Sequence, residues 1–171
     1  ESKRIFSAKT LKQRTQQIGL DKNIIILGDF NSDYEEYLKF IRKRELNDTY
    51  GKTGINHILG SGVQKERASQ VKYAENSFYN LWYDTDEESR YSYIFKGKKE
   101  AMDSILISQP LLGAKGISYE PSSITRYEKE YLLNKGQIYR WKISRGKAKQ
   151  HKGYGYSDHL AVVAKFRVKT K

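Results

Sequence analysis

The hydrophobic residues of the chain fall into short runs, and the most continuous one covers residues 24–27, three isoleucines and a leucine. A short apolar run between turn residues is typical of a strand buried on both faces. Gly28 ends the run, and Asp29 and Asn31 follow two positions apart. Because side chains alternate along an extended backbone, the pattern predicts a carboxylate and an amide on one side of the strand end.

Helices are predicted on both sides of this strand. Apolar spacings of three and seven predict a helix over residues 4–18, and a similar stripe predicts a second helix over residues 33–43. Ser32 and Glu35 have the spacing of a capping box, which would begin the second helix. Residues 47–70 are rich in glycine, asparagine, lysine and serine, so we expect a loop there with one short helix.

Alternation of apolar and polar residues predicts the remaining strands. Residues 91–95 and 102–107 are separated by the basic turn 96–99, which predicts that they pair in antiparallel fashion. Residues 137–143 also alternate, and residues 160–166 predict a final strand that is mostly buried. The acidic run over residues 84–88 is expected to form a solvated turn, because consecutive carboxylates rarely converge on a metal.

Composition narrows the class of protein. The 171 residues form one unit without visible repeats or linkers, long enough for a sizeable core. Thirty-two lysines and arginines against 20 acidic residues give a net charge of +12, which favours nucleic acid or an anionic membrane surface as partner. A lysine-rich composition that only aids solubility is the alternative. The absence of cysteine excludes disulfides, thiolate chemistry and cysteine-based zinc sites.

No apolar run approaches the roughly 20 residues that span a bilayer. The chain starts at Glu1 without a methionine or signal peptide, so we expect a fragment or a processed product. The compartment is left open between secreted or periplasmic and cytoplasmic.

Residues 113–150 interleave tyrosines and a tryptophan with many lysines and arginines. This pattern suits contact with a phosphate backbone and with unstacked bases, although a solvated, disordered loop is an equal alternative. The basic residues expected to contact nucleic acid are Lys96, Lys98, Arg145, Lys147, Lys149 and Lys152.

Five polar residues fall at the ends of apolar strands: Asp29, Asn31, Asp103, Asp158 and His159. Each alone could be a turn former, a cap or a salt-bridged residue. Together they lie at strand ends, which is where a scaffold of strands and helices commonly carries its functional residues. Carboxylates and an amide suit a hard cation such as Mg²⁺, a carboxylate can activate water, and a histidine held by a second carboxylate can donate to a phosphoryl oxygen. The set is therefore suited to hydrolysis of a phosphate ester.

At these positions the chain resembles a known family. Residues 26–31 (Ile-Leu-Gly-Asp-Phe-Asn), 102–106 (Met-Asp-Ser-Ile-Leu) and 157–159 (Ser-Asp-His) resemble three C-terminal motifs of the endonuclease/exonuclease/phosphatase superfamily. That group contains deoxyribonuclease I, abasic-site exonucleases, inositol polyphosphate phosphatases and sphingomyelinases. Residues 91–97 most resemble the bacterial deoxyribonuclease-like enzymes.

The resemblance implies a role for each of the five residues. Asp29 would orient the attacking water, and Asn31 would support the phosphate and the metal–water network. Asp158 would lie by the metal, which is expected to be Mg²⁺, with Mn²⁺ or Ca²⁺ as alternatives. His159 would contact the scissile phosphate and Asp103 would pair with His159.

The resemblance also implies the fold: α+β, half of a four-layer αββα sandwich, with a mixed, mostly antiparallel sheet and helices on one face. The N-terminal half, which in the family supplies an asparagine, the metal-binding glutamate and a further histidine or tyrosine, has no counterpart here. We therefore expect an exposed apolar sheet face, covered by the missing half in cis or trans or, alternatively, by self-pairing into a dimer.

The leading functional hypothesis is a metal-dependent nuclease, with DNA as the expected polymer and weak or no activity in the isolated chain. One alternative is a phosphoesterase that acts on inositol or lipid phosphates. The other is a non-catalytic half-domain that binds nucleic acid.

Overall fold

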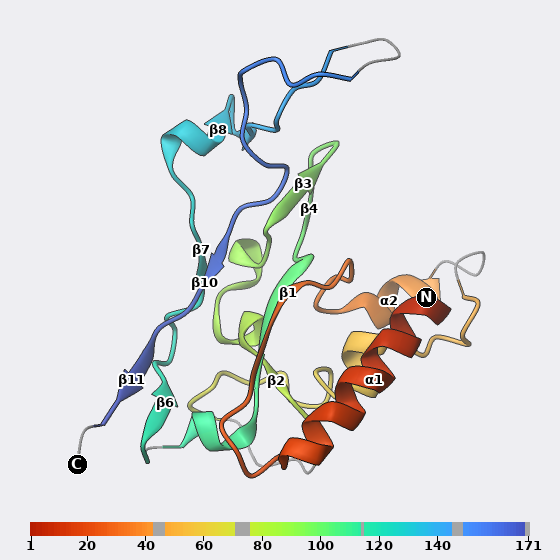
Figure 1. Cartoon of the computed structure of the whole chain (residues 1–171), viewed down its shortest axis with the longest axis vertical. Helices are drawn as coiled ribbons and strands as arrows, with labels where there is room; N and C mark the ends of the chain where they lie inside the picture. The colour runs from red at the N-terminus through yellow and green to blue at the C-terminus, as the bar shows by residue number, and fades with distance from the viewer. Residues whose placement is uncertain (43–46, 71–75, 114, 145–148, 170–171) are drawn as a thin grey trace.

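The chain has an α+β fold built from a few helices and short antiparallel strands (Figure 1). The computed structural model describes residues 1–42, 47–70, 76–113, 115–144 and 149–169. The helices of four or more residues are α1 (Ser2–Ile18), α2 (Glu36–Arg42), the π-helical turn η2 (Gly54–Ile58), and the 3₁₀ turns η3 (Leu81–Asp84) and η5 (Gln109–Leu112). No helix of the described ranges is long and apolar enough to cross a membrane.

The strands are β1 (Ile25–Asp29), β2 (Tyr79–Asn80), β3 (Tyr93–Phe95), β4 (Lys98–Glu100), β5 (Asp103–Ile107), β6 (Ile117–Tyr119), β7 (Thr125–Arg126), β8 (Leu133–Asn134), β9 (Gln137–Ile138), β10 (Val162–Val163) and β11 (Phe166–Val168). The central sheet has the order β1-β5-β2, and all its pairs are antiparallel. The other strands form two-stranded ladders: β3-β4, β6-β11, β7-β10 and β8-β9.

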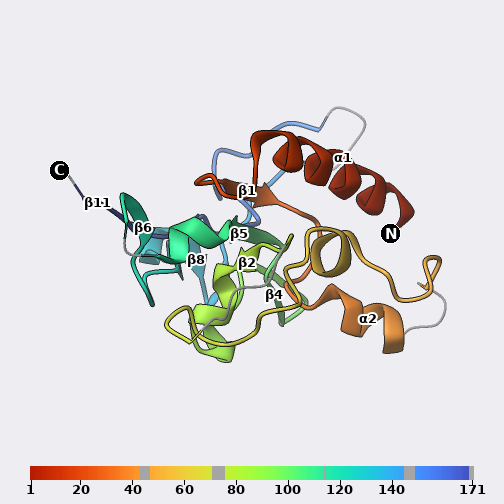
Figure 2. The ribbon, with the colours of Figure 1, turned by 90° about the horizontal axis from the view of Figure 1, so that it is seen from below.

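Helix α1 packs through its apolar residues on one hydrophobic cluster, formed by Ala8, Ile24, Ile55, Leu59, Phe78 and Leu106. Figure 2 shows α1 along one side of the fold, with the yellow turn of η2 close to it. A Cβ atom at Gly54 would lie 2.9 Å from the carbonyl oxygen of Arg4, so only glycine permits this close approach. The predicted helices over residues 4–18 and within 47–70 are therefore confirmed.

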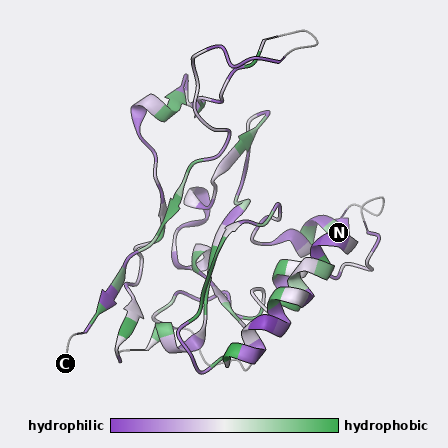
Figure 3. Ribbon diagram, viewed as in Figure 1, coloured by the Kyte–Doolittle hydropathy of each residue, from purple (hydrophilic) through white to green (hydrophobic). Residues whose placement is uncertain are grey.

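A second, more aromatic cluster contains Tyr79, Trp82 and Tyr83 together with Ile105 and Ile107 of β5. Leu106 points into the α1 cluster instead, so β5 is covered on both faces, as its alternation requires. In Figure 3 the central sheet is mostly hydrophobic, whereas α1 alternates between hydrophobic and hydrophilic residues.

The first strand does not have the environment predicted for it. We expected residues 24–27 to be buried on both faces, but Leu27 is 70% exposed and Ile25 is also exposed. These two side chains share the face of β1 opposite to Ile26, which packs toward α1. No strand among the described residues pairs with the outer edge of β1. An apolar strip on this face of the sheet is thus open to solvent.

The pairing predicted for residues 91–95 is wrong. Strand β3 pairs with β4, through a tight turn at Lys96 and Gly97, and not with residues 102–107. Both turn residues have positive φ values, 49° and 80°, which suits a hairpin turn that follows the twist of the strands. Because the hairpin closes within eight residues, β5 is free to enter the central sheet beside β1.

The start of the second helix also differs from the prediction. Helix α2 begins at Glu36, and its reciprocal cap is formed by Asp33 and Glu36 rather than by Ser32 and Glu35. The Asp33 backbone N–H donates to Glu36 Oε2 at 2.9 Å, and the Glu35 N–H donates to Asp33 Oδ1 at 3.2 Å. Asp33 also accepts from the Ala101 N–H at 3.0 Å, which fixes the helix start to the strand that leads to β5.

Three further expectations are corrected in the same way. Residues 137–143 contribute only the two-residue strand β9, and residues 160–166 are not a mostly buried strand, since Leu160 alone is buried there. In the acidic run, residues 86–88 are exposed as expected, but Asp84 is buried. The Asp84 carboxylate accepts from the Ala68 N–H at 2.7 Å and from the Tyr119 hydroxyl at 2.9 Å. These hydrogen bonds offset the desolvation cost of burying the carboxylate.

Candidate active site

Two carboxylates meet at one edge of the central sheet. Asp29 is the last residue of β1 and Asp103 is the first residue of β5, and the antiparallel register places them opposite each other. His159 joins them from the segment that precedes β10. One oxygen of each carboxylate and one nitrogen of the imidazole lie within 4.8 Å of one another. Residues separated by up to 130 positions thus converge on one point.

Asp103 and His159 form a close pair. The distance from His159 Nδ1 to Asp103 Oδ2 is 2.6 Å, which is typical of a strong hydrogen bond between a carboxylate and an imidazole. With Nδ1 facing the carboxylate, Nε2 is the ring nitrogen left to meet a substrate. Both side chains are partly exposed, so the pair is accessible from solvent.

Ser92 holds this pair in place from behind. Its hydroxyl donates to the same Asp103 Oδ2 at 2.5 Å and accepts from the Asp103 N–H at 3.1 Å, and its side chain is fully buried. The Ser92 carbonyl accepts from the Leu160 N–H at 2.7 Å, next to His159. The ring of Tyr93 lies 4.8 Å from the imidazole, centre to centre. Sequence reasoning missed Ser92 and Tyr93, whose position next to a strand pattern gave no separate signal.

Asn31 lies beside Asp29, but through a turn and not through extended backbone. Asn31 has a φ of 46°, a left-handed conformation that asparagine tolerates. Its backbone N–H donates to Asp29 Oδ1 at 2.8 Å and its amide nitrogen donates to Oδ2 at 3.2 Å. The Phe30 N–H donates to the Met102 carbonyl at 2.9 Å, which ties the turn to β5. The amide and the carboxylate are therefore adjacent, as predicted.

A hollow of about 330 Å³ adjoins this turn. Asp29 and Asn31 line one side of it, and Lys3 and Arg4 of α1 line another. Arg4 contacts the carbonyl oxygen of Asn31 and forms an ion pair with Glu36 at 3.3 Å, so its charge is already balanced.

The remaining predicted residues lie further out. Asp158 is half-buried next to His159, and it is not one of the three residues whose ligand atoms converge. Lys96 and Lys98 are exposed in the β3–β4 hairpin, where Lys98 pairs with Glu100 at 2.7 Å. Lys149 and Lys152 are exposed in the segment that leads to His159. Arg145 and Lys147 lie outside the described residues.

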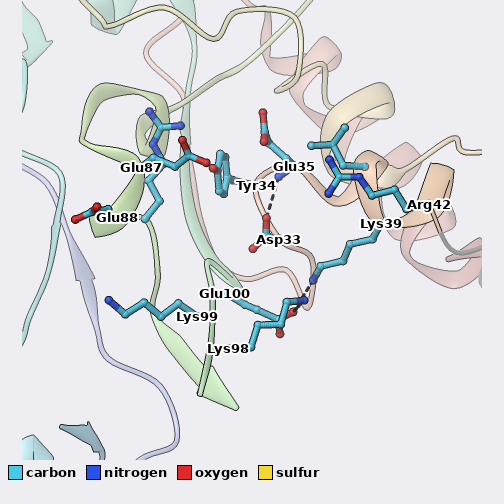
Figure 4. A pocket seen from close by; sticks show the side chains of 12 residues that line it. Asp33, Tyr34, Glu35, Lys39, Arg42, Glu87, Glu88, Lys98, Lys99 and Glu100 are labelled. Atoms are coloured by element: carbon cyan, nitrogen blue, oxygen red, sulfur yellow. Dashed lines mark hydrogen bonds and ion pairs between the residues drawn. The ribbon is translucent and has the colours of Figure 1, made fainter. Parts of the chain in front are cut away.

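A larger hollow, of about 650 Å³, lies elsewhere, between α2, residues 87–88 and the β3–β4 hairpin (Figure 4). Its charged lining contains residues of both signs, and Glu100 forms ion pairs with Lys39 at 2.8 Å and with Lys98 at 2.7 Å. Partial burial raises the pKa of Glu100, whereas Lys39 and Lys98 lower it, and the net shift is downward. None of the five candidate residues lines this hollow, which we assign no part in the chemistry.

The converging residues suit a hard divalent cation. Two carboxylates offer oxygen ligands at one point of the surface, and the exposed position of Asp29 leaves room for water and substrate to complete the coordination. The converging group also contains the imidazole of His159, so its donors are two carboxylate oxygens and one nitrogen. Comparison of the chain with family models, with curated proteins and with solved structures finds no match.

Proposed function

We propose that this chain hydrolyses phosphodiester bonds of nucleic acid, with DNA as the expected polymer, in a reaction that depends on a divalent cation. The observation that carries the proposal is the convergence of Asp29, Asp103 and His159, with the 2.6 Å contact between the last two. A general base, a cationic donor and carboxylate oxygens within a few ångströms are the groups that attack on a phosphodiester requires.

Each residue has a role that its contacts support. Asp29, whose two oxygens are oriented by Asn31, accepts a proton from the attacking water. His159 donates a hydrogen bond from Nε2 to a non-bridging phosphoryl oxygen, which gains negative charge as the water attacks. As the new P–O bond forms, the P–O bond to the leaving oxygen breaks; that oxygen takes a proton from solvent water, and Asp29 returns its proton to solvent. Asp103 orients the imidazole through Nδ1 and stabilises its protonated form, and Ser92 orients Asp103.

The cation would be held by the oxygens of Asp29 and Asp103, with Asp158 as a further candidate ligand on the strength of the family resemblance. When bound, it neutralises charge on the phosphoryl group and lowers the pKa of a coordinated water.

The charge of the chain supports a polymeric substrate. A net charge of +12 raises the local concentration of a polyanion and gains from each phosphate contact, whereas a small phosphorylated molecule fills only one site. The exposed strip at Ile25 and Leu27 further supports an arrangement in which this chain forms half of an αββα sandwich.

The test is cleavage of a labelled oligonucleotide at high protein concentration, with Mg²⁺ or Mn²⁺ and with a chelator. Asp29→Asn and His159→Ala should each lower the rate by roughly 100-fold or more, because the first removes the general base and the second removes the donor to the phosphoryl oxygen. Asp21→Asn is the matched control, since Asp21 is an exposed carboxylate near the opposite end of β1 that pairs with Lys22. A rate that survives the chelator, or that is equal in wild type and His159→Ala, would contradict the proposal.

A substrate panel separates the remaining alternatives. Cleavage of inositol or lipid phosphates alone would replace the nuclease by a phosphoesterase. Binding of oligonucleotides without cleavage in any variant would leave a binding module.

A further inference from the structure

Residues 139–144 and 149–156 lie side by side through backbone hydrogen bonds and form an arm above the β3–β4 hairpin in Figure 1. Backbone hydrogen bonds run from the Tyr156 N–H to the Tyr139 carbonyl at 2.9 Å and from the Lys142 N–H to the Tyr154 carbonyl at 3.1 Å. A Cβ atom at Gly155 would collide with the carbonyl of Arg140, 1.9 Å away, so the two sides of the arm approach as closely as the backbone permits. The arm therefore has a defined geometry.

The arm and the 3₁₀ turn Glu130–Leu132 together carry a group of aromatic rings, which we name the aromatic ladder: Tyr131, Tyr139, Trp141, His151, Tyr154 and Tyr156. Neighbouring ring centres are 5.6 Å apart for Tyr131 and Tyr156, 6.1 Å for Tyr139 and Tyr156, and 6.1 Å for Trp141 and His151. Trp141 is 49% exposed and Tyr156 is 59% exposed. A group of large, solvent-exposed aromatic side chains is typical of a binding surface for a ligand or partner.

Arg140, which lies between Tyr139 and Trp141 in the sequence, links the arm to the candidate active site. The guanidinium group of Arg140 lies 4.8 Å from the ring centre of Tyr93 and donates to the Ile94 carbonyl at 2.7 Å. Tyr93 in turn contacts the imidazole of His159, and its ring is stacked with that of Phe95. Arg140 and Tyr93 thus connect the arm with the residue that would contact the scissile phosphate.

The charge of the arm suits a phosphate backbone. Arg140, Lys142, Lys149 and Lys152 interleave with the rings, and residues 139–156 contain no aspartate or glutamate. Lysines and arginines attract the phosphates of any nucleic acid, single-stranded or duplex. The rings add a preference for single-stranded over duplex nucleic acid, because the faces of bases are free to stack on a side chain only when the bases are unpaired.

We propose that the aromatic ladder is a stacking platform for unpaired bases, and that the nucleic acid presented to the candidate active site is single-stranded. The part of this inference that concerns the reaction rests on the proposed function, whereas the binding of single strands does not. Successive bases stack on the rings while the adjacent basic side chains contact phosphates, and the strand continues past Arg140 and Tyr93 to His159.

The test is binding by fluorescence anisotropy, with the whole chain and a chelator present so that no cleavage occurs. The probes are a labelled 20-nucleotide DNA strand, its duplex, an abasic strand of equal length and the RNA strand of the same sequence. The DNA strand should bind at least tenfold more tightly than the duplex and the abasic strand, which lack free base faces. For RNA the single strand should bind more tightly than its own duplex by a similar factor.

Variants of the ladder locate the effect. Trp141→Ala and Tyr156→Ala should each weaken binding of the single strand by about fivefold or more, as expected for loss of one stacked base, and binding of the duplex by less than twofold. Trp141→Phe and Tyr156→Phe should retain most of the affinity because they keep a ring. Tyr50→Ala is the control, since Tyr50 is 98% exposed and lies outside the arm.

Equal affinity for strand and duplex, or ladder variants that behave like Tyr50→Ala, would overturn the inference and leave the rings as packing that stabilises the arm. Circular dichroism of each variant establishes that it is folded. A preserved preference for single strands without cleavage would count against the hydrolysis only, and cleavage without the preference would count against the ladder only.

Discussion

At the scale of single residues, the site depends on one buried hydroxyl. Ser92 binds both the carboxylate and the backbone N–H of Asp103, and Asp103 alone orients the imidazole of His159 through Nδ1. Without the hydroxyl, the carboxylate would lose one of the two partners of Oδ2 and gain freedom to rotate. The orientation of His159 therefore depends on a residue that cannot touch the substrate.

We predict that Ser92→Ala lowers the cleavage rate about tenfold, through loss of orientation, and shifts its pH profile. The free energy of unfolding should fall by about 1–3 kcal/mol, because the Asp103 N–H loses its buried acceptor. The control is Ser108→Ala, since Ser108 is equally buried and bonds the Ile24 N–H and the Lys22 carbonyl at the far end of β1. Ser108→Ala should cost similar stability, measured by urea unfolding, at an unchanged rate per folded molecule. Equal rates for the two variants would contradict a positioning role.

Sequence reasoning singled out Asp29, Asp103 and His159, which converge in the structure, because each follows or precedes an apolar run and polar side chains can gather at strand ends. It could not identify Ser92, which occupies an ordinary polar position in the alternation of residues 91–95. Its importance arises only from the partner across the hairpin, 11 residues away. Contacts of this kind depend on register, which one sequence does not specify.

At the scale of elements, the turn η2 is closed by a histidine side chain. His57 Nδ1 accepts from the Thr53 backbone N–H at 3.0 Å, so this nitrogen must be unprotonated for the contact to form. Partial burial and the nearby ammonium of Lys52 lower the pKa of His57, and the carboxylate of Glu1 raises it to a lesser extent. The turn η2 packs on α1, so its closure matters to the cluster beneath.

We predict that the free energy of unfolding falls as the pH is lowered below about 6.5, the ordinary value of the imidazole pKa. The unfolded chain takes up a proton there, whereas the folded chain resists it, so the contribution is complete above pH 6.5 and is lost below it. On unfolding, the His57 imidazole should bind less than one additional proton. His57→Gln retains an acceptor that does not titrate. Urea unfolding between pH 7.5 and 5 should therefore show a free energy of unfolding that depends less steeply on pH in this variant than in the wild type. Identical slopes would refute the assignment.

Element prediction succeeded where the signal was local. The helix over residues 4–18 has a local pattern and is present. Within the predicted turn 96–99, the turn itself lies at Lys96 and Gly97. The prediction failed where a strand had to be assigned its pairing partner. Residues 102–107 form a strand as predicted, but it pairs with β1 and β2 instead of with residues 91–95. The hairpin closure at Lys98–Glu100 excludes the predicted pairing, and apolar alternation alone cannot choose between the two.

At the scale of the whole molecule, the position of the core decides which apolar residues matter. An uninterrupted run of four apolar residues predicts burial on both faces, but β1 is an edge strand among the described residues and its outward side chains are exposed. The uninterrupted apolar run therefore does not distinguish a strand that is covered on both faces from an edge strand with one open face.

A pair of leucines tests this account of the core. Leu27 is 70% exposed, whereas Leu106, its near neighbour on β5, is 0% exposed within the α1 cluster. Leu27→Gln should change the free energy of unfolding by no more than about 0.5 kcal/mol, as for surface substitutions in general. Leu106→Ala should lower it by about 2–5 kcal/mol through loss of buried contacts and a residual cavity. Urea unfolding measures both changes. If the strip at Leu27 mediates association, Leu27→Gln should also reduce any concentration-dependent rise in mass seen by sedimentation. A Leu27→Gln chain as destabilised as Leu106→Ala would mean that β1 is covered on both faces in the folded monomer, and the half-sandwich arrangement would have to be abandoned.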